Sequence, residues 1–276
     1  MNALSHVMKG GARQTDTGTR AARRDRGSSE DRWAIPVLYA RRDGPAERFA
    51  GTLGAFHPIA VFLIAMLAGL IAIAALSIGI GFLVTGVLTH IWGVGAADER
   101  AAVWLAGHRT PGWTNVSLIG SIIAGGVVLP IVVALIAAVC LLLRKWRIAA
   151  FVVFALAVES ASYRATTLLV HRHRPSVVRL EHLPVNASYP SGHTAASIAV
   201  YAGLVLLLTS RITNRAFRVV AWTTAIAIPV FVAMSRMYRG MHHPLDVAGG
   251  LFVGVATLIV LVFACRAAGA AAKSPQ

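Results

Sequence analysis

The chain has 276 residues, of which 57% are hydrophobic and only 13% are charged, and its formal net charge is +15. A soluble domain carries about 25% charged residues, so the composition excludes an ordinary soluble protein and predicts an integral membrane protein. Ten of the 26 Lys and Arg residues precede His57, and no nucleic-acid recognition motif accompanies the charge. We therefore expect membrane lipids, and no nucleic acid, as partners.

The N-terminal segment is polar. Residues 1–54 are rich in Arg, Gly, Ser, Thr and Asp and lack a sustained apolar period. Such a segment buries too little apolar surface to offset the entropy cost of ordering. The sequence thus predicts a disordered, basic cytoplasmic tail over residues 1–54 and a membrane domain over residues 55–276.

Apolar runs follow the tail. A membrane-spanning helix needs about 20 residues, and runs of about 18 or more with few charges are candidates. Six runs qualify, at residues 58–89, 117–143, 149–170, 194–210, 217–234 and 245–264. We therefore expect an all-α integral membrane protein with six transmembrane helices in a bundle. A short amphipathic helix is expected over residues 96–107, at the outer interface.

Basic residues between the runs predict the orientation. The tail, the loop after the second run and the loop after the fourth run lie on one face and are rich in Arg and Lys. Cytoplasmic loops carry such an excess, so both termini are predicted to be cytoplasmic in a multi-pass protein of the cytoplasmic membrane. Cys140 and Cys265 lie within apolar runs and are interpreted as small buried hydrophobes, not as a disulfide or a metal pair.

Three short polar strings adjoin the apolar runs, and the predicted topology brings all three to the outer face. They are Arg174-Pro175, Pro190-Ser191-Gly192-His193, and Ser235-Arg236 followed by His242 and Asp246. Helix N-termini carry unpaired N–H groups and attract anions. Guanidinium groups match phosphate oxygens. These strings therefore indicate a phosphate-binding site.

Two histidines suggest what the site does with phosphate. His242 and Asp246 are four residues apart, so a carboxylate can hold one ring nitrogen as N–H and leave the other as a nucleophile. His193 begins a different helix and is available to protonate a leaving oxygen. The combination predicts phosphoryl transfer through a phosphohistidine, with no metal or other cofactor.

The order R-P, then P-S-G-H, then S-R-x5-H-x3-D resembles the type 2 phosphatidic acid phosphatase (lipid phosphate phosphatase) superfamily. The resemblance covers residues 147–264. It implies a six-helix bundle with a metal-independent site at one membrane face. It also implies His242 as nucleophile, Asp246 as its partner and His193 as proton donor. The implied phosphate cradle consists of Arg174, Ser191, Gly192 and Arg236.

One position departs from the family pattern. The family has a Lys seven residues before the Arg of R-P, and this chain has Thr167 there. Two residues are candidates to supply the missing cation. Arg172 lies two residues before Arg174 in the outer loop, and Arg164 lies about one turn deeper than Thr167 on nearly the same helix face. Ionisable residues within a span are functional candidates.

The expected activity is hydrolysis of a lipid phosphate or diphosphate at the outer membrane face. Analogy with similar proteins slightly favours a polyprenyl diphosphate as substrate. Phosphatidic acid and phosphatidylglycerol phosphate are the other candidates, and no residue decides among the three. Alternatives are a phosphotransferase on the same site, a vanadate-binding haloperoxidase, a six-span transporter and a receptor that only binds lipid phosphate. The sequence leaves the headgroup and the oligomeric state open.

Overall fold

The computed structural model describes residues 35–273 of the chain. The chain divides after Pro36 into two units, and the second, Val37–Gln276, holds helices α2 to α11. The described residues contain helices and no strand, and one isolated bridge joins Arg172 to Ala187. The all-α prediction is therefore confirmed for this part of the chain. The prediction for residues 1–34 lies outside the described residues.

The helices follow the apolar runs closely. In chain order they are η1 (Pro36–Leu38), α2 (Pro45–Thr52), α3 (Pro58–Gly86), η2 (Leu88–His90), α4 (Val94–Gly107), α5 (Pro111–Ile123), α6 (Val128–Leu142), α7 (Trp146–Leu169), α8 (Gly192–Ser197), η3 (Ile198–Ala202), α9 (Gly203–Thr209), α10 (Arg215–Tyr238) and α11 (Pro244–Ala271). Within the described residues, five helical stretches are long and apolar enough to cross a membrane, and a sixth is counted if a bent pair forms one span.

The bent pair is α5 and α6, which the sequence predicted as one span over residues 117–143. The two helices meet at an angle of 45°. Gly125 and Gly126 lie at the break, where glycine weakens a helix because it loses the most conformational freedom on folding. The hydroxyl of Tyr201 donates to the carbonyl oxygen of Ile123 at 2.6 Å, which satisfies a group that the break leaves open.

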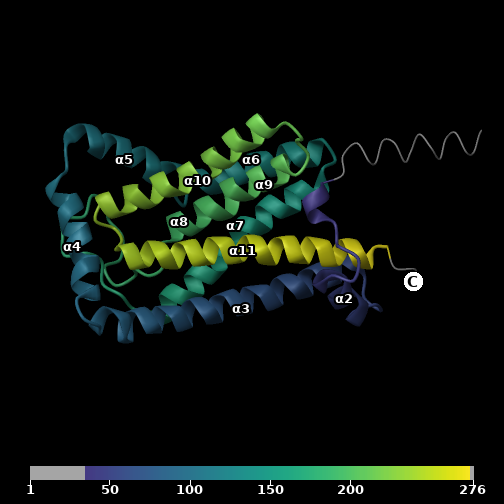
Figure 1. Cartoon of the computed structure of the whole chain (residues 1–276), viewed down its shortest axis with the longest axis horizontal. Coiled ribbons are helices and arrows are strands. Elements are labelled where there is room, and N and C mark those ends of the chain that lie inside the picture. Colours follow the sequence, from purple (N-terminus) through teal and green to yellow (C-terminus); the bar gives the residue numbers. More distant parts are fainter. Residues whose placement is uncertain (1–34, 274–276) are drawn as a thin grey trace, which may run out of the picture. The chain divides into compact units, whose positions relative to one another are not determined.

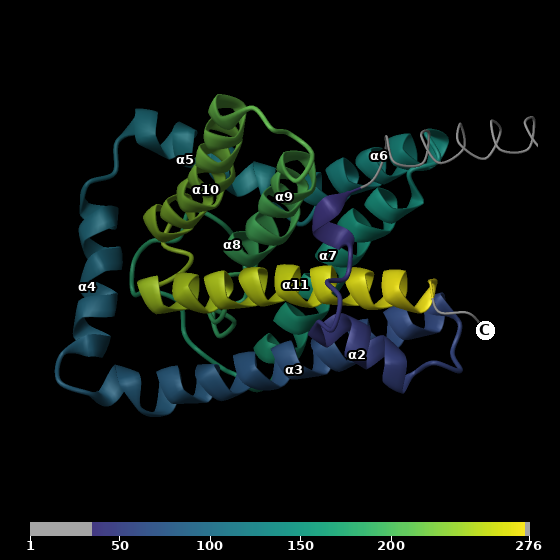
Figure 2. The same cartoon turned by 45° about the vertical axis from the view of Figure 1, so that its right-hand side comes forward.

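Helices α3 and α11 run side by side, and α7 packs on both of them (Figures 1 and 2). Helices α8, η3 and α9 form one continuous stretch from Gly192 to Thr209. Its middle turn is a π-helix, a feature that often accompanies functional sites. α4 lies across the end of the bundle at which α11 begins (Figure 2). It coincides with the expected amphipathic helix over residues 96–107.

The segment just before α3 differs from the expected disordered tail over residues 1–54. α2 packs against the end of α11, and Ala46 and Ala50 are buried in a cluster with Val61, Ala267 and Ala270. Pro45 begins the helix, a position that suits proline because no intrahelical N–H bond is lost there. Small apolar side chains let α2 approach α11 closely. The segment is too short for a hydrophobic period, so the sequence did not predict this packing.

Small residues also set the spacing between α11 and α8. A β-carbon added at Gly254 would lie 2.7 Å from the carbonyl oxygen of Ala195 and 2.8 Å from the β-carbon of Ile198. Both contacts are too short for a real β-carbon, and neither neighbour is the end of a flexible side chain. Gly254 therefore determines how closely the histidine-bearing end of the α8 stretch approaches α11.

We predict that Gly254→Ala lowers the stability of the protein by about 1–3 kcal/mol, because overpacking a close helix contact forces the backbone apart. Thermal unfolding in detergent measures the change. Gly79→Ala is the matched control, since a β-carbon there meets nothing within 4 Å. An unchanged unfolding temperature in Gly254→Ala would contradict this account of the contact.

Candidate active site

The three polar strings converge where α10 ends and where α8 and α11 begin. His193 interacts electrostatically with His242, Arg174 and Arg236, so groups from all three strings share one region. Arg174 in turn interacts with Arg236 and Asp246. Residues separated by up to 72 positions in the sequence are thus brought within electrostatic range of one another.

His242 is buried, and its ring is oriented by a backbone carbonyl. The Nδ1 atom lies 2.7 Å from the carbonyl oxygen of Ser188. Because a carbonyl only accepts hydrogen bonds, Nδ1 carries the proton in the neutral ring and Nε2 keeps its lone pair. Burial lowers the pKa of His242 to about 4, although the Asp246 carboxylate opposes this shift. The imidazole is therefore neutral at pH 7.

Asp246 is fully buried and saturated with hydrogen bonds. Its Oδ2 atom accepts from the Ser188 hydroxyl at 2.6 Å and from the His243 backbone N–H at 2.8 Å. Its Oδ1 atom accepts from Arg172. The distance from Oδ2 to His242 Nδ1 is 3.8 Å, an ion-pair distance and not a hydrogen bond.

This differs from the expected direct pairing of His242 with Asp246. The expectation assumed that both residues lie on one helix, whereas α11 begins at Pro244 and His242 precedes it. His243 is the N-cap of α11 and exchanges hydrogen bonds with Asp246 in a capping box. Asp246 therefore positions His242 mainly through Ser188, whose hydroxyl it binds and whose carbonyl holds the ring.

Arg172 lies behind the site and not within it. One Nη atom of Arg172 donates to Asp246 and the other to Asp98 of α4. Asp98 also accepts from the backbone N–H of Leu245 at 2.9 Å, which ties α4 to the start of α11. Both ends of the Arg172 fork are therefore engaged by carboxylates. The structure does not bring Arg172 to the cradle as the substitute cation that the sequence suggested.

Arg164 is also absent from the cradle. It is exposed on α7, while Thr167 donates to the carbonyl oxygen of Arg164 at 3.1 Å. Tyr163, one turn before Thr167, is the α7 side chain that faces the site. A β-carbon at Gly192 would lie 3.0 Å from its ring, and Tyr163 interacts electrostatically with Arg174 and Arg236.

Arg174, one of the two arginines of the expected cradle, is held by backbone carbonyl groups. Arg174 donates from Nε to the carbonyl of Pro184 and from Nη2 to that of Ala187, each at 2.8 Å. It also donates from Nη1 to the carbonyl of Met241. Burial lowers the pKa of Arg174 to about 10, so the group stays cationic at pH 7. Arg174 therefore ties together the loop between α7 and α8 and keeps two of its five N–H groups for another partner.

Arg236 is completely buried, and only one of its three guanidinium nitrogens forms hydrogen bonds within the described residues. Its Nη1 atom donates to the Ser121 hydroxyl and to Glu181, the latter at 2.7 Å. Its Nε and Nη2 atoms have no hydrogen-bond partner in the part of the chain that the structure describes. A buried guanidinium edge of this kind is costly unless it meets an anion. Arg236 thus presents a preformed anion-binding edge.

Glu181 is a residue of the site that sequence reasoning missed. Its carboxylate accepts from Arg236 at 2.7 Å, from Arg239 at 2.5 Å and from Ser121 at 2.7 Å. Burial opposes ionisation, but the Arg236 charge and these hydrogen bonds lower the pKa of Glu181 to about 2. The only sequence signal was an acid in an outer loop rich in arginine, which does not say which arginine it binds.

The start of the α8 stretch completes the site. The backbone N–H of Ser191 donates to the carbonyl oxygen of Asp246 at 2.9 Å, and the Ser191 hydroxyl lies 2.9 Å from that of Thr194. The N–H groups of the first turn beyond Ser191 have no intrahelical carbonyl to bind. The geometry thus brings together a neutral imidazole, a second histidine, two cations and a helix start, groups that suit the binding of an anion.

Residues 148–268 match the family model described as the PAP2 superfamily. This match confirms the resemblance inferred from the motifs. The matched region contains all the expected site residues. Among curated relatives, phosphatidylglycerophosphatase B of Bacillus subtilis is 27% identical over 180 residues, which cover 63% of this chain and 86% of the relative.

A second relative is an undecaprenyl-diphosphatase of Sulfolobus acidocaldarius, 41% identical over 75 residues, which cover 27% of this chain and 32% of the relative. The crystal structure of a transmembrane PAP2-type phosphatidylglycerolphosphate phosphatase from Bacillus subtilis has a TM-score of 0.57 and 22% identity. It covers 74% of this chain and 93% of that chain, and it shows the same fold. These matches confirm the predicted class, a multi-pass membrane phosphatase.

We predict that Glu181→Gln destabilises the protein by about 3–5 kcal/mol, because it leaves two buried guanidinium groups without their counter-charge. The measurement is thermal unfolding in detergent as a function of pH. Since the folded-state pKa of Glu181 is depressed to about 2, its contribution is present above the unfolded value of about 4.3 and is lost as the pH falls through about 2.

The difference in unfolding temperature between wild type and Glu181→Gln should therefore be largest above pH 5 and shrink in acid. Glu47→Gln is the control, because Glu47 is an exposed residue of α2. A difference that is independent of pH would show that the Glu181 charge does not stabilise Arg236.

Proposed function

We propose that the protein hydrolyses the phosphomonoester or diphosphate of a lipid through a phosphohistidine on His242. The single observation that carries the proposal is the buried edge of Arg236, whose Nε and Nη2 atoms lack a partner in the described part of the chain. This edge shares a region with His242 and His193. A phosphoryl group bound there meets a nucleophile and a proton donor together.

In the first step the Nε2 lone pair of His242 attacks phosphorus, an N–P bond forms and the P–O bond to the lipid breaks. The leaving oxygen takes a proton from His193, whose protonated form is favoured by the negative charge of the bound phosphoryl group, and His193 becomes neutral. Charge that develops on the phosphoryl oxygens is stabilised by Arg236, by the free N–H groups of Arg174 and by the backbone around Ser191 and Gly192. In the second step His193 accepts a proton from water, which attacks the phosphohistidine and releases inorganic phosphate.

The substrate class is a phosphorylated membrane lipid. Phosphatidylglycerol phosphate, a polyprenyl diphosphate and phosphatidic acid are the candidates, and the curated relatives support the first two by name. The relative named for phosphatidylglycerophosphate matches over most of its length. We therefore propose phosphatidylglycerol phosphate as the first substrate to test.

We further propose that the site faces away from the cytoplasm, with six spans and both termini cytoplasmic. The basic loops at the opposite end of the bundle support this orientation through the positive-inside rule. An engineered cysteine at exposed Val178 tests it. Labelling from outside intact cells is expected, and labelling only after lysis would contradict the orientation.

We predict that His242→Ala abolishes phosphate release from phosphatidylglycerol phosphate in detergent, and that a chelator leaves the wild-type activity unchanged. Arg236→Lys should reduce kcat/KM by about 10²–10³-fold, since an ammonium does not reproduce the planar edge. The assay is release of inorganic phosphate, with an acceptor alcohol added in one arm. Activity in His242→Ala, or dependence on an added metal, would overturn the mechanism. Phosphate appearing on the alcohol would identify a transferase.

The pH dependence follows from the burial of His242. Attack requires the neutral ring, and burial lowers the pKa of His242 to about 4. The acid limb of log(kcat/KM) for the free enzyme is therefore expected near pH 4, with activity lost below it, and not near the ordinary histidine value of about 6.5. Ser188→Ala, which keeps the backbone carbonyl but removes the hydroxyl bound to Asp246, should move this limb while leaving some activity.

A further inference from the structure

The end of α11 remote from the site carries a second feature that the proposed function does not use. Asp246 and Arg266 are 20 residues apart on this continuous helix. At 1.5 Å per residue the separation is about 30 Å, the thickness of the hydrocarbon core of a bilayer. Arg266 therefore lies at the membrane interface opposite the one that contains the catalytic groups.

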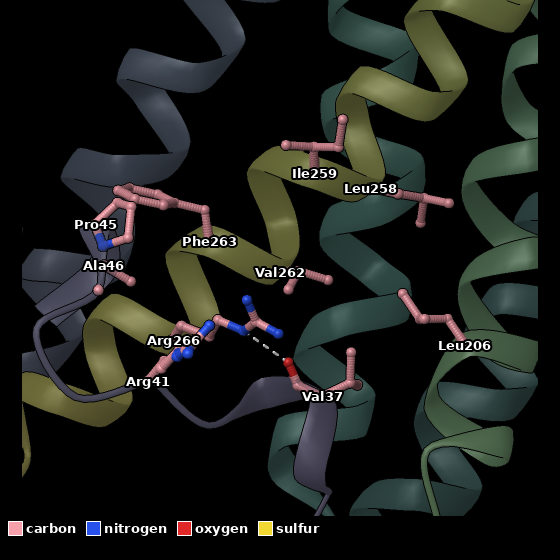
Figure 3. Close-up of a pocket in the computed structure, with 11 residues that line it drawn as sticks. Val37, Arg41, Pro45, Ala46, Leu206, Leu258, Ile259, Val262, Phe263 and Arg266 are labelled. Carbon is pink, nitrogen blue, oxygen red and sulfur yellow. Dashed lines mark hydrogen bonds between the residues drawn. The ribbon is translucent and has the colours of Figure 1, made fainter.

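A groove of about 380 Å³ opens beside Arg266 (Figure 3). Its wall is apolar and comes from α9 and α11, through Leu206, Leu258, Ile259, Val262 and Phe263. Its polar rim consists of Arg41 and Arg266, and among residues 35–273 no acidic residue lines it. The groove thus combines an apolar wall long enough for hydrocarbon with a cationic rim at one end.

The rim is held in place. Arg266 donates from Nε to the carbonyl oxygen of Val37 at 2.9 Å, which leaves both Nη atoms for another partner (Figure 3). Arg41 follows in the same segment, just before α2, and is exposed. α2 packs against α11 and so fixes this segment beside the groove. Two guanidinium groups at one rim repel each other, and an anion between them relieves that repulsion.

We propose that this groove binds one anionic glycerophospholipid of the leaflet opposite the catalytic site. The phosphodiester contacts Arg41 and Arg266, and one acyl chain lies along the apolar wall between α9 and α11. Basic residues at a membrane surface attract anionic lipid in this way, and the apolar wall lies at the depth of the acyl chains. The site is separate from the proposed phosphatase site and does not depend on it.

Charge complementarity favours a lipid over other occupants. A soluble anion would not use the apolar wall. An apolar helix from another chain would not use the two guanidinium groups. A phospholipid uses both features of the groove, and the groove volume falls within the range of about 300–1,000 Å³ that is typical of small-molecule sites.

The test uses the full-length protein purified in a non-ionic detergent. Its unfolding temperature is measured against increasing phosphatidylglycerol, against phosphatidylcholine with the same acyl chains, and against inorganic phosphate. Phosphatidylglycerol is a phosphodiester, so it is not a substrate of the proposed phosphatase. We expect phosphatidylglycerol, and not phosphatidylcholine, to raise the unfolding temperature through the groove. Equal shifts with both lipids would overturn the charge contact. Inorganic phosphate also fits the proposed phosphatase site, so a phosphate shift counts against the lipid only if replacement of Arg41 and Arg266 removes it.

Arg41→Gln combined with Arg266→Gln should raise the half-saturating concentration of phosphatidylglycerol by about thirtyfold. The matched control is Arg42→Gln with Arg48→Gln, which removes the same charge from exposed positions that do not line the groove. Equal weakening in both double variants would show that only net charge matters and would overturn the proposal.

Because Arg266 also donates to the carbonyl oxygen of Val37, its replacement removes a contact that holds this segment. Ile259→Trp provides an independent test, since Ile259 lines the groove and 65% of its surface is exposed. Its larger ring should fill the groove and weaken phosphatidylglycerol binding while phosphatase activity persists. Unchanged binding in Ile259→Trp would exclude the groove as the lipid site.

Discussion

The carboxylate of Asp246 is the interaction on which the rest of the site depends. A buried charge is tolerated only when its hydrogen bonds are satisfied, and Asp246 has partners on both oxygens: Arg172, Ser188 and His243. Its backbone carbonyl also accepts from Ser191. One residue therefore joins the loop after α7, the start of the α8 stretch and the start of α11. Through Arg172 and Asp98 the same network reaches α4.

In the proposed mechanism, the residues that hold the site in shape differ from the residues that contact the substrate. Asp246, Arg172 and most of Arg174 are engaged with protein atoms, so they hold the loop rigid. His242 is left with one free ring nitrogen, and Arg236 with one free guanidinium edge. Glu181 binds the opposite edge of Arg236 and directs the free edge elsewhere. Rigid support of this kind is what electrostatic stabilisation of a transition state requires, because donors already in place cost nothing to reorganise.

The thickness of the bilayer is a second constraint, and α11 is long enough to span it. One end carries Asp246 and the other carries Arg266, with an uncharged stretch of about the hydrocarbon thickness between them. The helix therefore ties the hydrogen-bond network around Asp246 to the segment that contains α2. An anionic lipid bound at Arg41 and Arg266 would anchor the end of the helix whose other end holds the buried carboxylate of Asp246.

The sequence by itself located the apolar helices and the polar motifs beside them, because hydropathy and motif spacing are local properties of the chain. The run at residues 58–89 became α3 with η2, and the motif residues His193, Arg236 and Asp246 lie at helix ends as their spacing indicated. Only the tertiary structure decided the partners of these groups. Arg172 donates to Asp98 and Asp246, and Glu181 accepts from Arg236. The His242 ring contacts the carbonyl of Ser188, although helical spacing had predicted a contact with Asp246. These pairings join segments far apart in sequence, and the packing of helices, which no local pattern records, brings such segments together.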